Sequence, residues 1–443
     1  MVKLKLLAAA LAGLLVSLCL SACNYIGTDP QTLIEPPRAT GELYHIQTAL
    51  KRYVNRSVTM KYPRSGDNRS AFVLADLDGD GEEEAVAFYS VAAENNVSPI
   101  HINIIDKQDG EWISVADQPT TATDVDKVAF ADVDSDGCDE LLVGLQMYSS
   151  TENQLNVYSF KNGKITQQMQ EVYTEFVTCD LTGRGREELV ILTLSTADKR
   201  AEARLYTLDG DVIVEEGSTQ LDGSVSGYAR VQAGTIGEGR SAVYIDANKA
   251  SNAMITDVLF WDGSSLVNPF FDVSTGENPV TLRESTDTCR DINGDGQLDI
   301  PSLVPMPGSM LKTPSERMYL TVWKDFDGLR LTDIYKGDMN YKDGYSFAFP
   351  ERWVGNITSV ADPGNRMRSY KLWDPVNQME TDEILRIRVY SESEFAALDK
   401  EERREYIELD RRNSLVYVAQ ILTNKGEYAM NKREILDSFQ LIG

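Results

Sequence analysis

The stretch ADLDGDGEEEAVAF, at residues 75–88 of this 443-residue chain, carries the strongest structural signal in the sequence. Its carboxylates stand at alternate positions with glycines between them: Asp76, Asp78, Asp80 and Glu84. Alternate carboxylates around glycines wrap oxygen ligands around a hard cation such as Ca²⁺, because glycine permits the tight turn that such a loop needs. Several unrelated calcium loops share this spacing, so the surrounding sequence must distinguish them.

Related loops recur along the chain at a nearly constant period. They begin at five positions: Asp76, Asp132, Asp180, Gly234 and Asp291. The steps between them are 56, 48, 54 and 57 residues. An EF-hand needs flanking helices and a glutamate at loop position 12, and none of these loops has that glutamate. Apolar, β-branched runs follow the loops instead, and Pro301 would break the helix of a dockerin. The loops are therefore expected to join two strands.

Each repeat continues with a second hairpin. An apolar strand reaches a glycine turn (QDG, KNG, LDG, WDG or FDG) and a second strand returns from it. Four strands at a period near 50 residues are the sequence signature of a β-propeller. We therefore expect a mainly β fold, in which residues 70–337 form a closed ring of about five four-stranded blades. A solenoid is the alternative, but its strands would be fewer and its repeat shorter.

The loop pattern hydrophobic–D-x-D-x-D-G-x-x-E/D–hydrophobic resembles the FG-GAP (VCBS-like) repeats of integrin-α-type propellers. The resemblance implies calcium loops between the first two strands of each blade. Members of that family usually have six or seven blades, so the five visible repeats depart from its pattern. Residues 41–54 place Leu43, Ile46, Leu50 and Tyr53 on one face, which predicts an amphipathic helix packed on the propeller.

Three loops keep a complete ligand set, which predicts about three structural Ca²⁺ ions. Side chains at loop positions 1, 3, 5 and 9 and the carbonyl at position 7 are the expected ligands: Asp76, Asp78, Asp80, Glu82 and Glu84; Asp132, Asp134, Asp136, Cys138 and Glu140; Asp291, Asn293, Asp295, Gln297 and Asp299. In the third loop we expect the guanidinium of Arg184 to replace the cation by pairing with Asp180 and Glu188. The fourth loop, from Gly234, has no ligands and is expected to be empty.

The first 22 residues are typical of a secretory signal peptide, with two lysines followed by an apolar run. They lead into LSAC at 20–23, which resembles the bacterial lipobox. The resemblance implies cleavage before Cys23 and a lipid anchor on the extracytoplasmic face of a bacterial membrane. An ordinary secretory signal with a chance cysteine is the alternative. Residues 23–40 are predicted to be a tether, and residues 41–69 a helix and lead-in.

The repeat stops after residue 337. YSFAFPERW at 345–353 and ILDSFQLI at 435–442 resemble the PsbP-like α+β fold, an antiparallel sheet flanked by helices. Residues 341–443 are therefore expected to form a separate α+β domain. No ligand residues follow from this resemblance.

Charge and missing motifs limit the function. The formal net charge of −26 argues against nucleic acid as a partner. The chain contains no HExxH, GxSxG or CxxC motif, and its two histidines, His45 and His101, do not suggest a general base. We expect a cell-surface, non-catalytic binding or scaffold protein with an unidentified protein or glycan ligand. The alternative is an extracellular polysaccharide hydrolase or lyase, which would need paired carboxylates outside the metal loops.

Overall fold

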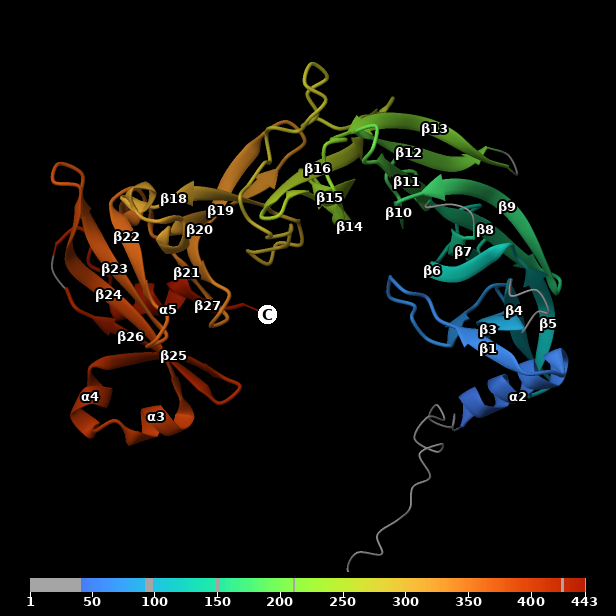
Figure 1. The fold of residues 1–443 in the computed structure, drawn as a ribbon, viewed down its shortest axis with the longest axis horizontal. Coiled ribbons are helices and arrows are strands. Elements are labelled where there is room, and N and C mark those ends of the chain that lie inside the picture. Colours follow the sequence, from blue (N-terminus) through green and yellow to red (C-terminus); the bar gives the residue numbers. More distant parts are fainter. Residues whose placement is uncertain (1–40, 92–98, 149–151, 210–211, 424–425, 443) are drawn as a thin grey trace, which may run out of the picture.

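The computed structural model describes residues 41–91, 99–148, 152–209, 212–423 and 426–442. The predicted signal peptide, Cys23 and tether lie outside these residues. Within the described part of the chain, no helix has the length and apolar character needed to cross a membrane. The fold is mainly β, and Figure 1 shows its sheets following one another along an arc.

Four antiparallel sheets, with strands in chain order, make up the first part of the arc. In the first sheet, β1 and β2 pair with the same edge of β3 and form one interrupted inner strand. The strands of this sheet are β1 (Val58–Lys61), β2 (Phe72–Ala75), β3 (Glu84–Val91), β4 (Ile100–Gln108) and β5 (Glu111–Pro119). The second sheet contains β6 (Ala122–Ala131), β7 (Glu140–Met147), β8 (Asn153–Lys161) and β9 (Lys164–Tyr173). The third and fourth contain β10 (Glu175–Cys179), β11 (Glu188–Ser195), β12 (Arg200–Asp209), β13 (Val212–Leu221), β14 (Gly227–Ile236), β15 (Arg240–Ala250), β16 (Ala253–Trp261) and β17 (Leu266–Val267).

The predicted metal loops join strands, as the sequence indicates. The first loop connects β2 to β3, and the second connects β6 to β7. The loop from Asp291 follows Arg290, which forms an isolated bridge with Asp299, and it leads into β18 (Ile300–Pro305). The strands on both sides of the first two loops, and the strand that follows the loop from Asp291, contradict an EF-hand or dockerin interpretation. Several four-stranded sheets of this kind are consistent with propeller blades.

Apolar faces of consecutive sheets pack against each other. Phe88 and Ile102 of the first sheet, for example, share a buried core with Val128 and Leu141 of the second. Similar cores join the second sheet to the third, the third to the fourth and the fourth to the fifth. Each sheet therefore buries both faces, which is how a blade is stabilised in a propeller.

The segment between β17 and β18 covers part of the fourth sheet through a buried ion pair. The Arg283 guanidinium lies 2.8 Å from an Asp246 carboxylate oxygen, and both side chains are fully buried. The other Asp246 oxygen accepts a hydrogen bond from the backbone N–H of Cys289 at 2.8 Å. This cluster fixes the segment that leads into the loop at Asp291. Cys289 is a buried free thiol, whereas the free thiols of Cys138 and Cys179 are half-buried.

The fifth sheet crosses the domain boundary expected between 337 and 341. Its order is β18-β19-β20-β21-β27, so strands of the last repeat are hydrogen-bonded to strands from the C-terminal hundred residues. The remaining strands of this sheet are β19 (Tyr319–Phe326), β20 (Leu331–Asn340), β21 (Tyr345–Ala348) and β27 (Phe439–Leu441). Because β20 pairs directly with β21, a separate C-terminal α+β domain is not clearly shown.

A last antiparallel sheet packs on the fifth. One core combines Leu320 and Val322 of β19 with Trp353, Tyr370 and Ile387. The sheet contains β22 (Ile357–Asp362), β23 (Met367–Asp374), β24 (Met379–Ser391), β25 (Tyr406–Arg412) and β26 (Leu415–Ile421). The short helices of this region are α3 (Glu392–Ala397), α4 (Lys400–Arg404) and α5 (Lys432–Ser438).

The closed ring expected from the repeat is not what the structure shows. Figure 1 places the first sheet near one end of the arc, and the fifth sheet, followed by the sheet β22–β26, toward the other end. The face that each would turn to the other in a ring is covered by another element. Helix α2 (Glu42–Val54) packs on the first sheet, as predicted, and buries Ile46 and Leu50 in the same core as Ala87 and Tyr89. Leu43 and Tyr53, predicted on the same face, are exposed. The sheet β22–β26 covers the fifth. The apolar faces are satisfied without closure.

Candidate metal centre

The first loop turns tightly between β2 and β3 and brings its ends together. Ala75, the last residue of β2, pairs with Glu84, the first residue of β3. Gly79 and Gly81 have φ values of 75° and 91°, a region that other residues rarely adopt without strain. The ligand oxygens of three carboxylates, Asp76, Asp78 and Glu84, lie within 4.8 Å of one another. The structure thus brings together three of the four predicted side-chain ligands of this loop, and Asp80 is not in the group.

The first aspartate of each loop organises the backbone. The two carboxylate oxygens of Asp76 accept hydrogen bonds from the N–H groups of Gly79 at 2.8 Å and Gly81 at 3.0 Å. Asp180, in the third loop, accepts the equivalent bond from Gly185 at 2.8 Å. Since Asp180 lies in a loop that has lost other ligand residues, an aspartate at position 1 does not by itself indicate a cation.

The residue at position 9 is more informative. Glu84 is fully buried, and one of its oxygens accepts the N–H of Leu77 at 2.7 Å, whereas Oε1 has no hydrogen-bond partner. Asp299 repeats this arrangement: it is fully buried, it accepts the N–H of Ile292 at 2.9 Å, and its Oδ1 has no partner. Burial raises the pKa of Glu84 to about 7 and that of Asp299 to about 6. An ionised carboxylate with an unpartnered buried oxygen is unfavourable unless a cation compensates it.

The second loop contains a lysine. Ligand oxygens of Asp132, Asp134 and Asp136 lie within 4.8 Å of one another. The Lys161 ammonium, from the end of β8, lies 3.0 Å from Asp134 and also pairs with Asp136. Burial and the charge of Asp134 raise the pKa of the neighbouring Glu140 to about 8. Sequence reasoning missed Lys161, because it is 21 residues beyond Glu140.

The third loop corrects a prediction. Arg184 does not pair with Asp180 and Glu188 through its guanidinium; it pairs with Glu216, with Nη1 at 2.9 Å from the carboxylate. The hydroxyl of Thr182 donates to Oε1 of the buried Glu188, and the N–H groups of Leu181 and Thr182 donate to Oε2. The threonine at position 3 therefore satisfies the oxygen that stays unpartnered in Glu84. Thr182 at position 3 is the sequence signal from which this contact could be predicted.

The remaining loops differ from these three. In the fourth, β14 and β15 pair as far as Ile236 and Arg240, and the buried Ala242 takes the place of the position-9 carboxylate. In the loop from Asp291, the Asn293 amide nitrogen donates to Asp295 at 2.8 Å. The carbonyl ligands expected from Glu82, Cys138 and Gln297 stay predictions. Two acidic triads could thus hold metal ions, and their arrangement does not define the ion.

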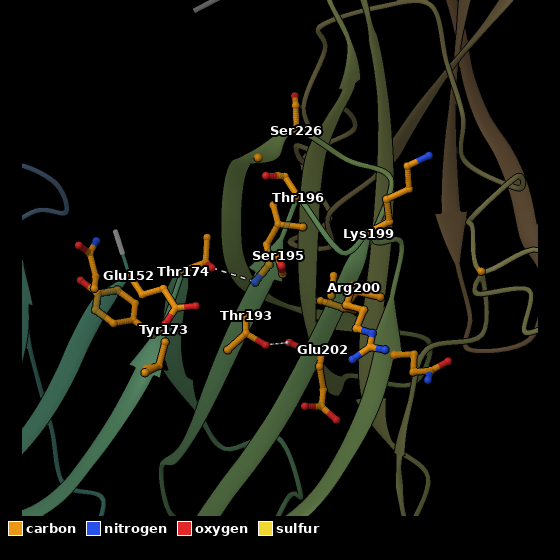
Figure 2. A pocket seen from close by; sticks show the side chains of 18 of the residues that line it. Glu152, Tyr173, Thr174, Thr193, Ser195, Thr196, Lys199, Arg200, Glu202 and Ser226 are labelled. Carbon is orange, nitrogen blue, oxygen red and sulfur yellow. Dashed lines mark hydrogen bonds between the residues drawn. The ribbon is translucent and has the colours of Figure 1, made fainter. Parts of the chain in front are cut away.

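A groove of about 750 Å³ lies at the end of β11 that is opposite to the third loop. Figure 2 shows hydroxyl groups and charged side chains around it. The backbone N–H of Leu194 donates to the Thr174 hydroxyl at 2.9 Å and ties β11 to the end of the second sheet. Charges of both signs line the groove: Glu152, Lys199, Arg200 and Glu202. Sequence reasoning did not identify this groove, because its lining comes from the second, third and fourth sheets.

Comparisons with known proteins give structural matches with low scores. No protein-family model matches the chain, and neither does any curated protein. The chain has structural similarity to β-propeller proteins. The rhamnogalacturonan lyase YesW matches with 14% identity and a TM-score of 0.25 over 60% of both chains, so this chain spans less than two thirds of that enzyme. The Dos1 propeller matches with 11% identity and a TM-score of 0.30, over 84% of this chain and 98% of that one. Scores this low carry no argument about function.

Proposed function

We propose that this protein is a calcium-stabilised, non-catalytic binding or scaffold protein, anchored by a lipid on Cys23 to the extracytoplasmic face of a bacterial membrane. The observation that carries the calcium part is the pair of fully buried carboxylates, Glu84 and Asp299, that each leave one oxygen without a partner. The FG-GAP-like assignment of the repeats and the PsbP-like assignment of the C-terminal strands belong to this proposal.

Calcium fits these loops better than other common metals. The expected ligands are carboxylate, amide and carbonyl oxygens, which suit hard cations, and no histidine or thiolate is among them. Magnesium demands a small octahedral site, whereas calcium accepts a flexible loop with six to eight oxygens. A bound ion would connect the segments that enter and leave each loop, so its role would be structural.

The groove supports a binding function more than a catalytic one. A retaining or inverting glycosidase needs a desolvated general acid beside a second carboxylate. Glu152 and Glu202 are both exposed, so neither is in the apolar environment that such an acid requires. The hydroxyl groups of Thr193, Ser195, Thr196 and Ser226 provide a polar lining of the kind that hydrogen-bonds to glycan hydroxyls.

The calcium proposal is tested by melting the mature protein in EGTA, in millimolar Ca²⁺ and in millimolar Mg²⁺. We expect Ca²⁺ to raise the melting temperature well above that in EGTA. Asp78→Ala should remove about one bound ion, whereas Glu238→Ala, in the fourth loop, should remove none. Equal losses of calcium from the two variants, or equal melting in all three buffers, would contradict the proposal.

The other parts need separate measurements. A palmitate analogue should label the wild-type protein in cells and should not label Cys23→Ala; a labelled variant would refute the anchor. For the ligand, a glycan array is screened with the calcium-loaded protein, and any bound polysaccharide is tested for cleavage. Cleavage that disappears in Glu202→Gln would favour the hydrolase or lyase alternative.

A further inference from the structure

The residue across the sheet from loop position 9 differs among the five repeats. Ala85 pairs with Ile105, so Glu84 lies next to Asp106 on the neighbouring strand β4. Ile300 pairs with Lys324, so Asp299 lies next to Asp325 on β19. Directly opposed residues of an antiparallel pair have Cβ atoms about 5 Å apart, and like charges there are destabilising. The first and fifth sheets therefore each place two carboxylates where repulsion is strongest.

The other sheets have neutral residues at the same register position. Leu141 pairs with Tyr158, which puts Ser159 beside Glu140. Leu189 pairs with Tyr206, which puts Thr207 beside Glu188. Ser159 accepts a hydrogen bond from Gln168 at 2.8 Å, and Thr207 accepts one from Arg186 at 2.8 Å. In the fourth sheet the position is Phe260.

The hydrogen bonds and ion pairs of each loop's carboxylates vary with the residue that lies across the sheet from position 9. Where it is aspartate, the position-9 carboxylate leaves an oxygen unpartnered. Where it is threonine, in the third sheet, the Thr182 hydroxyl satisfies that oxygen. Where it is serine, in the second sheet, Lys161 brings a positive charge to the loop. In the two loops that face an aspartate, no described group of the protein donates a hydrogen bond to one buried oxygen of the position-9 carboxylate.

A further observation supports the site in the fifth sheet. Asp325 Oδ1 is buried and has no hydrogen-bond partner, like Asp299 Oδ1 beside it. In the first sheet, one oxygen of Asp106 accepts a hydrogen bond from the Gln108 amide at 2.9 Å.

We propose that Asp106 and Asp325 are cation ligands, supplied by the neighbouring strands β4 and β19 in addition to the ligands of the two loops. The inference rests on the proposed calcium binding and goes beyond the loop motif, which does not include these residues. An ion held by both strands would tie β4 to the loop between β2 and β3, and β19 to the loop before β18. The second loop, with Lys161 among its carboxylates, is then the weakest of the three.

The test uses calcium titration calorimetry on the mature protein and on four variants. Asp106→Asn and Asp325→Asn each remove one negative charge from a proposed site, and Asp382→Asn removes one from an exposed position on β24 as a matched control. We expect each of the first two to lower the affinity of one site about tenfold, since ligand charge sets calcium affinity, and the control to change nothing. Lys161→Gln should raise the affinity of one site.

Melting in EGTA separates a ligand from a structural residue. If Asp106 only repels Glu84 in the calcium-free protein, Asp106→Asn should raise the melting temperature in EGTA while it reduces the increase that Ca²⁺ produces. A residue with a purely structural role would lower both. Wild-type calcium binding with unchanged affinity in Asp106→Asn and Asp325→Asn would overturn this inference alone, whereas a wild-type protein that binds no calcium would overturn the proposed function as well.

Discussion

Calcium binding should release protons and weaken steeply between pH 8 and pH 6. Ordinary carboxylates are fully ionised in this range, so calcium binding to them does not depend on pH there. Burial raises the pKa of Glu84 to about 7 and that of Glu140 to about 8. A cation bound to either group must therefore displace a proton over much of this pH range.

The two pKa values give the size of the effect. A site that requires one ionised group of pKa about 7 loses about tenfold in affinity when the pH falls from 8 to 6. If the required group has a pKa of about 8, the calcium affinity falls about 50-fold over the same pH change. For Asp299, whose pKa is about 6, the affinity falls only about twofold. The loops should thus respond to pH in the order second, first, fifth.

The pH should affect the stability of the calcium-free protein and the stabilisation by calcium in opposite directions. These carboxyls bind protons more tightly in the folded chain than in the unfolded chain. Their contribution to the free energy of unfolding of the calcium-free protein is therefore fully present below the unfolded pKa and is lost as the pH rises through about 7 to 8. Calcium should accordingly raise the melting temperature more at pH 8 than at pH 5.

Calorimetry at pH 6 and pH 8, in two buffers of different ionisation enthalpy, measures both the affinity and the number of protons released. We expect a fraction of a proton to appear for each ion at neutral pH. A calcium affinity that is the same at pH 6 and pH 8, with no proton release, would refute the argument. It would mean that Glu84 and Glu140 are ionised in the calcium-free protein.

Three further substitutions probe separate parts of the fold by urea unfolding in EGTA. Thr182→Val leaves the buried Glu188 oxygen without its donor and should destabilise the protein by about 1–3 kcal/mol; an unchanged midpoint would show that the hydroxyl is dispensable. Arg283→Met leaves the Asp246 charge buried and unpaired and should cost about 3–5 kcal/mol, and a loss under 1 kcal/mol would contradict the buried pair. Leu50→Ala creates a cavity under α2 and should lower the free energy of unfolding by about 2–5 kcal/mol; an unchanged midpoint would show that the helix does not cover the first sheet.

Local pattern predicted local structure well. The loop at 75–88 and the strand after it could be assigned because the signals are local. Glycine positions, alternating carboxylates and a β-branched run all lie within this one short segment. Helix α2 was predictable because its apolar residues recur at helical spacing. The contacts of the third loop were not, because residue spacing does not show that Thr182 reaches Glu188 while Arg184 reaches Glu216.

Long-range pairing was beyond the sequence. Closure of the repeats depends on whether the first sheet packs against the fifth or against other elements, and no residue pattern encodes that choice. The pairing of β21 with β27 joins residues nearly a hundred positions apart, so the repeat, which stops at residue 337, does not reveal that the fifth sheet continues beyond it. Lys161 and Asp325 lie near the loops because of the register between β7 and β8 and between β18 and β19, which the sequence pattern does not specify.

The covers at the two ends of the arc have a mechanical consequence. In a closed ring, a rotation between two blades must be compensated by opposite rotations elsewhere, because the last blade has to meet the first. With α2 over the first sheet and β22–β26 over the fifth, rotations at successive interfaces need not cancel, and small angles add up along the arc (Figure 1). An open arc of sheets can therefore bend in a way that a closed ring cannot. Ions in the loops would stiffen individual sheets without fixing the angles between neighbouring sheets.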